Sequence, residues 1–101
     1  MSVKIPIPET EIEAFCRRNG IRRLALFGSI LRDDFGPDSD VDVLVEFEPG
    51  ARVGLFELYD MEQELGLLLG GRKVDMNTPK SLSQYFRDRV LREAEVHYAA
   101  T

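Results

Sequence analysis

The sequence is poor in the residues that form disulfides or bind zinc in many small proteins. It has one cysteine, Cys16, one histidine, His97, and no tryptophan. One cysteine excludes an internal disulfide, and a lone histidine without a cysteine cluster leaves no ligand set for structural zinc. We expect His97, close to the end of the chain, at the surface rather than in catalysis. The lack of disulfides fits a reducing cytoplasm, which is where we expect the protein to work.

Positive charge is also scarce, and so are long apolar runs. Lys and Arg number 13 against 18 Asp and Glu, which gives a net charge of -5 at pH 7. This balance argues against direct binding to a nucleic-acid backbone, which needs clustered cations, but it permits binding of a single nucleotide. The apolar stretch around Leu65 to Leu69 is far shorter than the roughly 20 residues of a membrane span. We therefore expect neither a membrane nor a nucleic acid as a direct partner.

What the sequence does contain is an alternation of helix and strand patterns over 101 residues, a length that suits one domain over residues 1–101. We predict a first helix between Thr10 and Gly20 and a last helix over 82–97. Between them we predict strands over 22–27, 40–47 and 72–76, a brief helix over 30–34 and a longer helix over 54–69. This order indicates an α/β fold with a small mixed β-sheet whose helices pack on one face and leave the other face open.

The helix predicted over 54–69 carries an apolar stripe that we expect to pack in the core. One charged residue, Glu62, interrupts the stripe, which otherwise consists of Leu55, Leu58, Tyr59, Leu65 and Leu69. Leu67 and Leu68 lie partly outside the stripe, so a partner surface is possible at these two residues.

Residues 40–47 alternate between apolar and polar side chains, which predicts a half-buried strand. Asp40 and Asp42 lie two residues apart and project from the same face, with Cα atoms roughly 6.5–7 Å apart. Paired carboxylates can share divalent cations, and Mg²⁺ prefers carboxylate, phosphate and water oxygens. The alternative is a solvated strand end, and the pair alone does not decide between the two.

A second motif precedes this pair by ten residues, where the strand predicted over 22–27 ends at Gly28 and Ser29. Glycine lets a backbone approach a phosphate closely, and serine adds a hydroxyl donor. The brief helix that follows would offer free N–H groups to an anion. Gly-Ser alone is a common turn, but together with the carboxylates it supplies the parts that hold a nucleoside triphosphate and its metal ions.

Gly28-Ser29, ten residues and then Asp40-Val41-Asp42 closely resemble the signature of the DNA polymerase β-like nucleotidyltransferases. More narrowly, the chain resembles the minimal nucleotidyltransferases of the MntA antitoxin type. The resemblance implies the polymerase β-like fold, contact of Gly28 and Ser29 with the triphosphate, and Mg²⁺ bound by Asp40 and Asp42. It also implies a third carboxylate on a later strand, for which Asp75 is the match. In the family this residue completes the metal site and helps to deprotonate the acceptor hydroxyl.

Two basic residues lie beside these motifs. The resemblance implies that Arg32 contacts phosphate or a partner, with a solvated helical arginine as the alternative. Asp33 and Asp34 add negative charge next to it, where several relatives are more basic. If residues 72–76 form a strand, Lys73 shares a face with Asp75 and can meet phosphate charge.

The resemblance also implies a reaction, a substrate and a partner. MntA-type proteins act beside a HEPN-type ribonuclease toxin and transfer AMP from ATP to one of its tyrosines, so we expect ATP, Mg²⁺ and a hetero-oligomer with that toxin here. The chain is short for a nucleotidyltransferase with a separate substrate domain, which fits a protein acceptor. Two alternatives stay open. The protein can neutralise a toxin by binding alone, or it can act on the hydroxyl of a small molecule.

Overall fold

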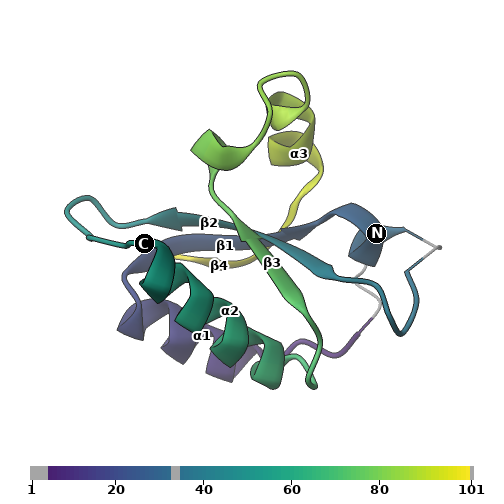
Figure 1. The fold of residues 1–101 in the computed structure, drawn as a ribbon, viewed down its shortest axis with the longest axis horizontal. Coiled ribbons are helices and arrows are strands. Elements are labelled where there is room, and N and C mark those ends of the chain that lie inside the picture. The colour runs from purple at the N-terminus through teal and green to yellow at the C-terminus, as the bar shows by residue number, and fades with distance from the viewer. Residues whose placement is uncertain (1–4, 33–34, 101) are drawn as a thin grey trace.

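A four-stranded mixed sheet organises the chain in the computed structural model, which describes residues 5–32 and 35–100 (Figure 1). The strand order is β3-β2-β1-β4, with β1 antiparallel to β2 and β4, and β2 parallel to β3. The elements in chain order are α1 (Glu9–Arg18), β1 (Ile21–Phe27), a 3-10 helix η1 (Gly28–Leu31), β2 (Val41–Phe47), α2 (Leu55–Leu68), β3 (Val74–Asn77), a 3-10 helix η2 (Pro79–Ser81), α3 (Arg87–Glu93) and β4 (Glu95–Ala99).

The main core lies between the sheet and the helices α1 and α2, which pack together on one face (Figure 1). Alternate residues of β1 and β2 point into it, because successive side chains of a strand face opposite ways. The fully buried members from the sheet and helices include Leu24, Leu26, Val43, Val45, Ile12, Phe15 and Leu65. The predicted α/β fold with a small mixed sheet is therefore confirmed.

The opposite face of the sheet, which we expected to be open, is covered in part. Figure 1 shows α3 on the side of the sheet away from α1 and α2. A second, smaller apolar cluster forms there around Ala25 and Leu44 of the sheet and Leu82 of the segment before α3. Val90 and Ala94 pack against the same cluster. This segment therefore closes one part of the face and leaves the neighbouring part accessible.

The helix predicted over 82–97 is wrong in its second half. The helix α3 ends at Glu93, and the chain then runs as β4, in which Leu24 pairs with Tyr98 and Leu26 with Glu95. Pairing with β4 satisfies backbone groups of β1 that would otherwise form an unpaired sheet edge. These hydrogen bonds depend on β1, which lies about seventy residues earlier in the chain. The local sequence pattern of residues 94–97 therefore cannot indicate the strand.

The helix α2 buries a different set of residues from the predicted stripe. Leu65 and Leu69 are buried as expected, but Leu55 is 84% and Tyr59 60% exposed. The charged interruption has a structural role, because the Glu62 carboxylate accepts a hydrogen bond of 2.8 Å from the backbone N–H of Met76 in β3. The contact satisfies an amide on an edge strand of the sheet. With 14 residues, α2 is the longest helix in the described part of the chain, and no helix there has the length and apolarity needed to cross a membrane.

The brief helix predicted over 30–34 starts earlier, as the 3-10 helix η1, and residues 33 and 34 lie outside the described residues. A backbone hydrogen bond of 2.9 Å from Arg32 to the carbonyl of Ser29 closes this turn. A four-residue 3-10 helix has little of the aligned dipole of a longer α-helix. The expected contribution of a helix N-terminus to anion binding is therefore small here.

Candidate active site

The turn after β1 places a glycine directly against an aspartate of β2. Gly28 has a backbone φ of +78°, a conformation that residues with a side chain rarely adopt. A Cβ added at this position would lie 3.2 Å from the carboxyl carbon of Asp42 and still closer to one of its oxygens. Glycine is therefore required both by the turn and by the space, and it brings the backbone of the turn next to a carboxylate.

A second carboxylate lies beside Asp42 on the next strand. Asp75 of β3 is the register partner of Asp42 in the parallel pair, and adjacent strands are about 4.8 Å apart. Val41, Val43, Val74 and Met76, which flank the two aspartates, all point into the main core. Asp42 and Asp75 therefore project together from the opposite face, the one that carries α3. This agrees with the face predicted for Asp42 from its alternation with valines.

The charges around Asp42 are unbalanced toward the negative. Burial raises the pKa of its carboxyl, and the nearby charges of Asp75 and Asp40 raise the pKa further, while Arg32 lowers it. Crowded carboxylates resist ionisation unless a cation joins them. Arg32 is thus close enough to act on the Asp42 carboxyl electrostatically.

Asp40 and Lys73 lie at the beginning of the two parallel strands, where the amide of Val41 donates a 2.9 Å hydrogen bond to the carbonyl of Lys73. Both side chains line a separate hollow of about 390 Å³, together with Asp38 and Arg72. Lys73 therefore does not line the cleft that contains Gly28 and Asp42.

The donor chemistry of the carboxylates suits a hard divalent cation, because it consists of oxygen alone. Asp42 and Asp75 are adjacent, and Asp40 is close enough to raise the pKa of Asp42. Among residues 5–32 and 35–100, no three His, Cys, Asp or Glu side chains are already grouped closely enough to hold one metal ion. The arrangement thus offers a pair of neighbouring carboxylates and a third one at its border, rather than a preformed three-ligand cage.

A cleft of about 960 Å³ opens beside this pair, between the turn after β1 and the helix α3. On one side it is lined by Phe27, Gly28, Leu31, Arg32 and Asp42. The other side comes from the segment of Phe86 to Glu95, which includes Phe86, Arg89 and Val90. Sequence reasoning missed this second wall, although the spacing of Phe86, Val90 and Ala94 by four residues indicates one helical face.

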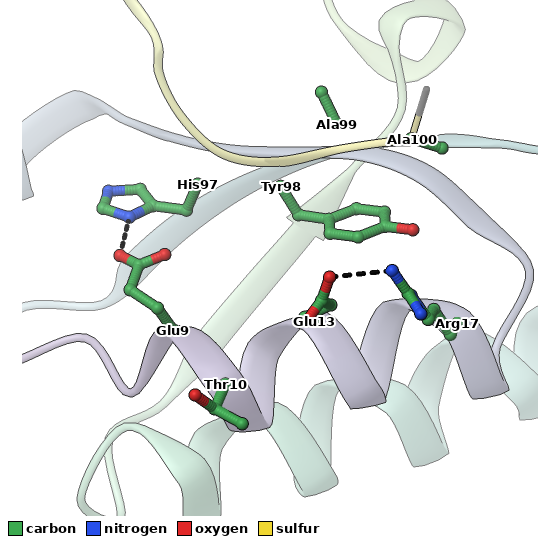
Figure 2. A pocket seen from close by; sticks show the side chains of 8 residues that line it. All are labelled: Glu9, Thr10, Glu13, Arg17, His97, Tyr98, Ala99 and Ala100. Atoms are coloured by element: carbon green, nitrogen blue, oxygen red, sulfur yellow. Dashed lines mark hydrogen bonds and ion pairs between the residues drawn. The ribbon is translucent and has the colours of Figure 1, made fainter.

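A different cavity, of about 620 Å³, lies between α1 and β4 (Figure 2). His97 lines this cavity, and its side chain, 9% exposed, is more covered than the expected surface position implies. Its ring nitrogens contact Glu9 of α1 at 2.8 Å and Glu95 at 2.9 Å. Figure 2 shows the contact to Glu9 and an ion pair between Glu13 and Arg17 within α1. Of these contacts, the one between His97 and Glu9 joins β4 to α1. None of the candidate carboxylates lines this cavity.

Comparison with known proteins supplies a family for this arrangement. A family model described as a nucleotidyltransferase domain matches residues 9–97. The chain is 41% identical over 76 residues to the protein adenylyltransferase MntA of Thermococcus cleftensis, covering 75% of this chain and 74% of that protein. A solved structure of a minimal nucleotidyltransferase is 36% identical and superposes with a TM-score of 0.69 over 85% of each chain. A toxin–antitoxin structure with AMP-PNP superposes with a TM-score of 0.72 at 21% identity, over 93% of this chain and 75% of that one.

Proposed function

Because the chain belongs to the nucleotidyltransferase domain family, we propose that it is an antitoxin that transfers AMP from ATP to a partner HEPN-type ribonuclease toxin. The acceptor is a hydroxyl, that of a tyrosine. The observation that carries the proposal is the contact of the Gly28 turn with Asp42, beside Asp75. The 41% identical relative is named a protein adenylyltransferase, and the toxin–antitoxin structure holds AMP-PNP, an ATP analogue, which supports ATP as the donor.

Each residue of the site has a proposed role in this reaction. The backbone at Gly28 and the hydroxyl of Ser29 contact the phosphates, and Arg32 adds positive charge. Asp42 and Asp75, with Asp40 at their border, hold Mg²⁺. When bound, Mg²⁺ neutralises the charge of the triphosphate and of the carboxylates. Lys73 meets phosphate charge only from the side of Asp40, because it lines the hollow there.

The proposed step is an in-line displacement at the α-phosphorus of ATP. The acceptor hydroxyl oxygen forms a new bond to this phosphorus, and the bond to the bridging oxygen of the leaving pyrophosphate breaks. Asp75 accepts the hydroxyl proton. Its exposed position at the edge strand β3 leaves it accessible to a protein acceptor. The chain then works as a hetero-oligomer with its toxin, in the cytoplasm, where ATP and a reducing environment are available.

A second candidate function, neutralisation by binding alone, is favoured by a different observation. Leu55 and Phe56 at the start of α2 are 84% and 86% exposed, and such side chains suit a protein interface. Co-expression with the proposed toxin partner separates the two functions. If catalysis neutralises the toxin, the double variant Asp40→Asn/Asp42→Asn still copurifies with the toxin but no longer protects cells. If the double variant protects as well as the wild type does, binding alone is sufficient and the catalytic proposal is wrong.

A further inference from the structure

The residue that precedes α3, Phe86, has an aromatic side chain that does not belong to the second apolar cluster. Phe86 and Ala94 cap the two ends of α3, and backbone hydrogen bonds run from Val90 to Phe86 and from Ala94 to Val90. Because the three residues follow at intervals of four, they share one face of this short helical segment. Val90 and Ala94 pack against the second apolar cluster. Phe86 continues the same face beyond that cluster and remains 46% exposed. A large apolar side chain in this position is available to a ligand.

The space in front of Phe86 is the cleft that also contains the candidate phosphate turn. Phe86 and Val90 line it from one side, and Gly28, Arg32 and Asp42 line it from the other. Its volume of about 960 Å³ lies at the upper end of the range typical of small-molecule sites. The apolar surface is supplied by aromatic and aliphatic side chains, and Arg89 and Glu93, paired at 3.4 Å, add polar groups to the lining. One continuous cleft thus joins a polar end at Arg32 and Asp42 to an apolar wall at Phe86 and Val90.

We propose that this wall is the subsite for the purine base of the donor nucleotide, with the ring of Phe86 stacked against the base. This inference rests on the proposed function, because it takes ATP as the molecule whose phosphates meet the Gly28 turn. Phosphates, ribose and base are covalently joined, so a nucleotide held at Gly28 and Asp42 has its remaining part within reach of the same cleft. Base stacking on an aromatic side chain is favourable for any purine and needs no buried polar group.

An aromatic side chain of the acceptor protein is the competing occupant of the cleft. It would have to enter from outside and bring its own backbone toward Asp42, whereas the base arrives with the triphosphate. The base is therefore the occupant that we infer, and the acceptor becomes a distinguishable outcome of the test.

The test measures binding of two ligands, ATP and inorganic triphosphate, by calorimetry in the presence of Mg²⁺. The variant Phe86→Ala should weaken ATP binding by about tenfold or more, the usual effect of losing one stacking aromatic, and should leave triphosphate binding unchanged. Phe86→Trp should retain ATP binding, since it keeps a stacking surface. Tyr85→Ala is the matched control: Tyr85 is the neighbouring residue, is 90% exposed and does not line the cleft, so both affinities should stay at wild-type values.

Other results overturn the inference in recognisable ways. If Phe86→Ala binds ATP normally but transfers AMP to its partner more slowly, the wall receives the acceptor rather than the base. If ATP and triphosphate weaken equally, Phe86 acts through the structure of the turn. If the wild type binds triphosphate as tightly as ATP, the base makes no contact and this inference fails while the phosphate site stands. If the wild type binds neither ligand, the proposed function fails together with the subsite.

Discussion

Replacing Gly28 by alanine is the substitution that most sharply separates folding from function in this protein. At φ +78° an alanine costs about 1–2 kcal/mol of folding free energy, because its Cβ crowds the backbone in the left-handed region. Gly50 has a similar φ of +90°, and no described atom lies within 4 Å of its added Cβ. Gly28→Ala and Gly50→Ala should therefore lose comparable amounts of stability, a fall in melting temperature of about 4–8 °C per kcal/mol for a domain of this size.

The two variants should differ in activity, because only the Cβ at residue 28 meets Asp42. The collision is relieved most easily by rotation of the Asp42 carboxylate, which moves it away from the turn and from Asp75. Misplacing a catalytic group by about 1 Å can reduce a rate by about 100-fold. AMP transfer measured at a temperature where both variants are folded should therefore fall by about that factor in Gly28→Ala and remain near the wild-type rate in Gly50→Ala. Equal transfer rates for the two variants would refute the placement of Gly28 against a catalytic carboxylate.

Three further predictions follow from buried or paired groups. Burial and the charges of Asp75 and Asp40 raise the pKa of the Asp42 carboxyl above its usual 3.8. The folded protein therefore binds the carboxyl proton more tightly than the unfolded chain does, and the contribution of Asp42 to stability falls as the pH rises above 3.8. In EDTA, Asp42→Asn should therefore be more stable than the wild type at pH 7 in urea unfolding, and the difference should shrink toward pH 4; a constant difference would contradict the assignment. Burial raises the pKa of the Cys16 thiol to about 12, so a thiol reagent at pH 8 should modify it only after unfolding, and rapid modification of the folded protein would show that the site opens. Glu62→Ala should lower the free energy of unfolding by about 1–3 kcal/mol, because the backbone N–H of Met76 loses its hydrogen-bond acceptor. Gln63→Ala, at the exposed neighbouring residue, should change the free energy of unfolding by less than about 0.5 kcal/mol.

The sequence predicted the central parts of the candidate site because those parts depend on local rules. Strand alternation places Asp42 opposite the flanking valines, and the structure has it on that face. The first strand gives way to the turn at Gly28 in both the prediction and the structure. Asp42 and Asp75 are adjacent because of the register between two strands, and the sequence indicates this pairing only through the family resemblance.

What the sequence did not predict depends on contacts between distant residues. The strand β4 forms because it can pair with the edge of β1. The local pattern of residues 94–97 is compatible with a helix and contains no information about this pairing. His97 is covered because β4 lies over α1, where Glu9 meets its ring. The aromatic wall of Phe86 belongs to the cleft only because α3 returns to the face of the sheet that carries Asp42. In each case tertiary packing, rather than local propensity, decides the environment of the residue.

The central claim is that this protein moves the AMP portion of ATP onto its partner. Its most direct test incubates the protein, Mg²⁺ and the proposed toxin partner with ATP that is labelled either on the α-phosphate or on the γ-phosphate. The account predicts that the α-label becomes covalently attached to the toxin, that the γ-label leaves as pyrophosphate, and that Asp42→Asn abolishes the attachment. Attachment of the γ-label, or attachment of the α-label that persists in Asp42→Asn, would contradict it.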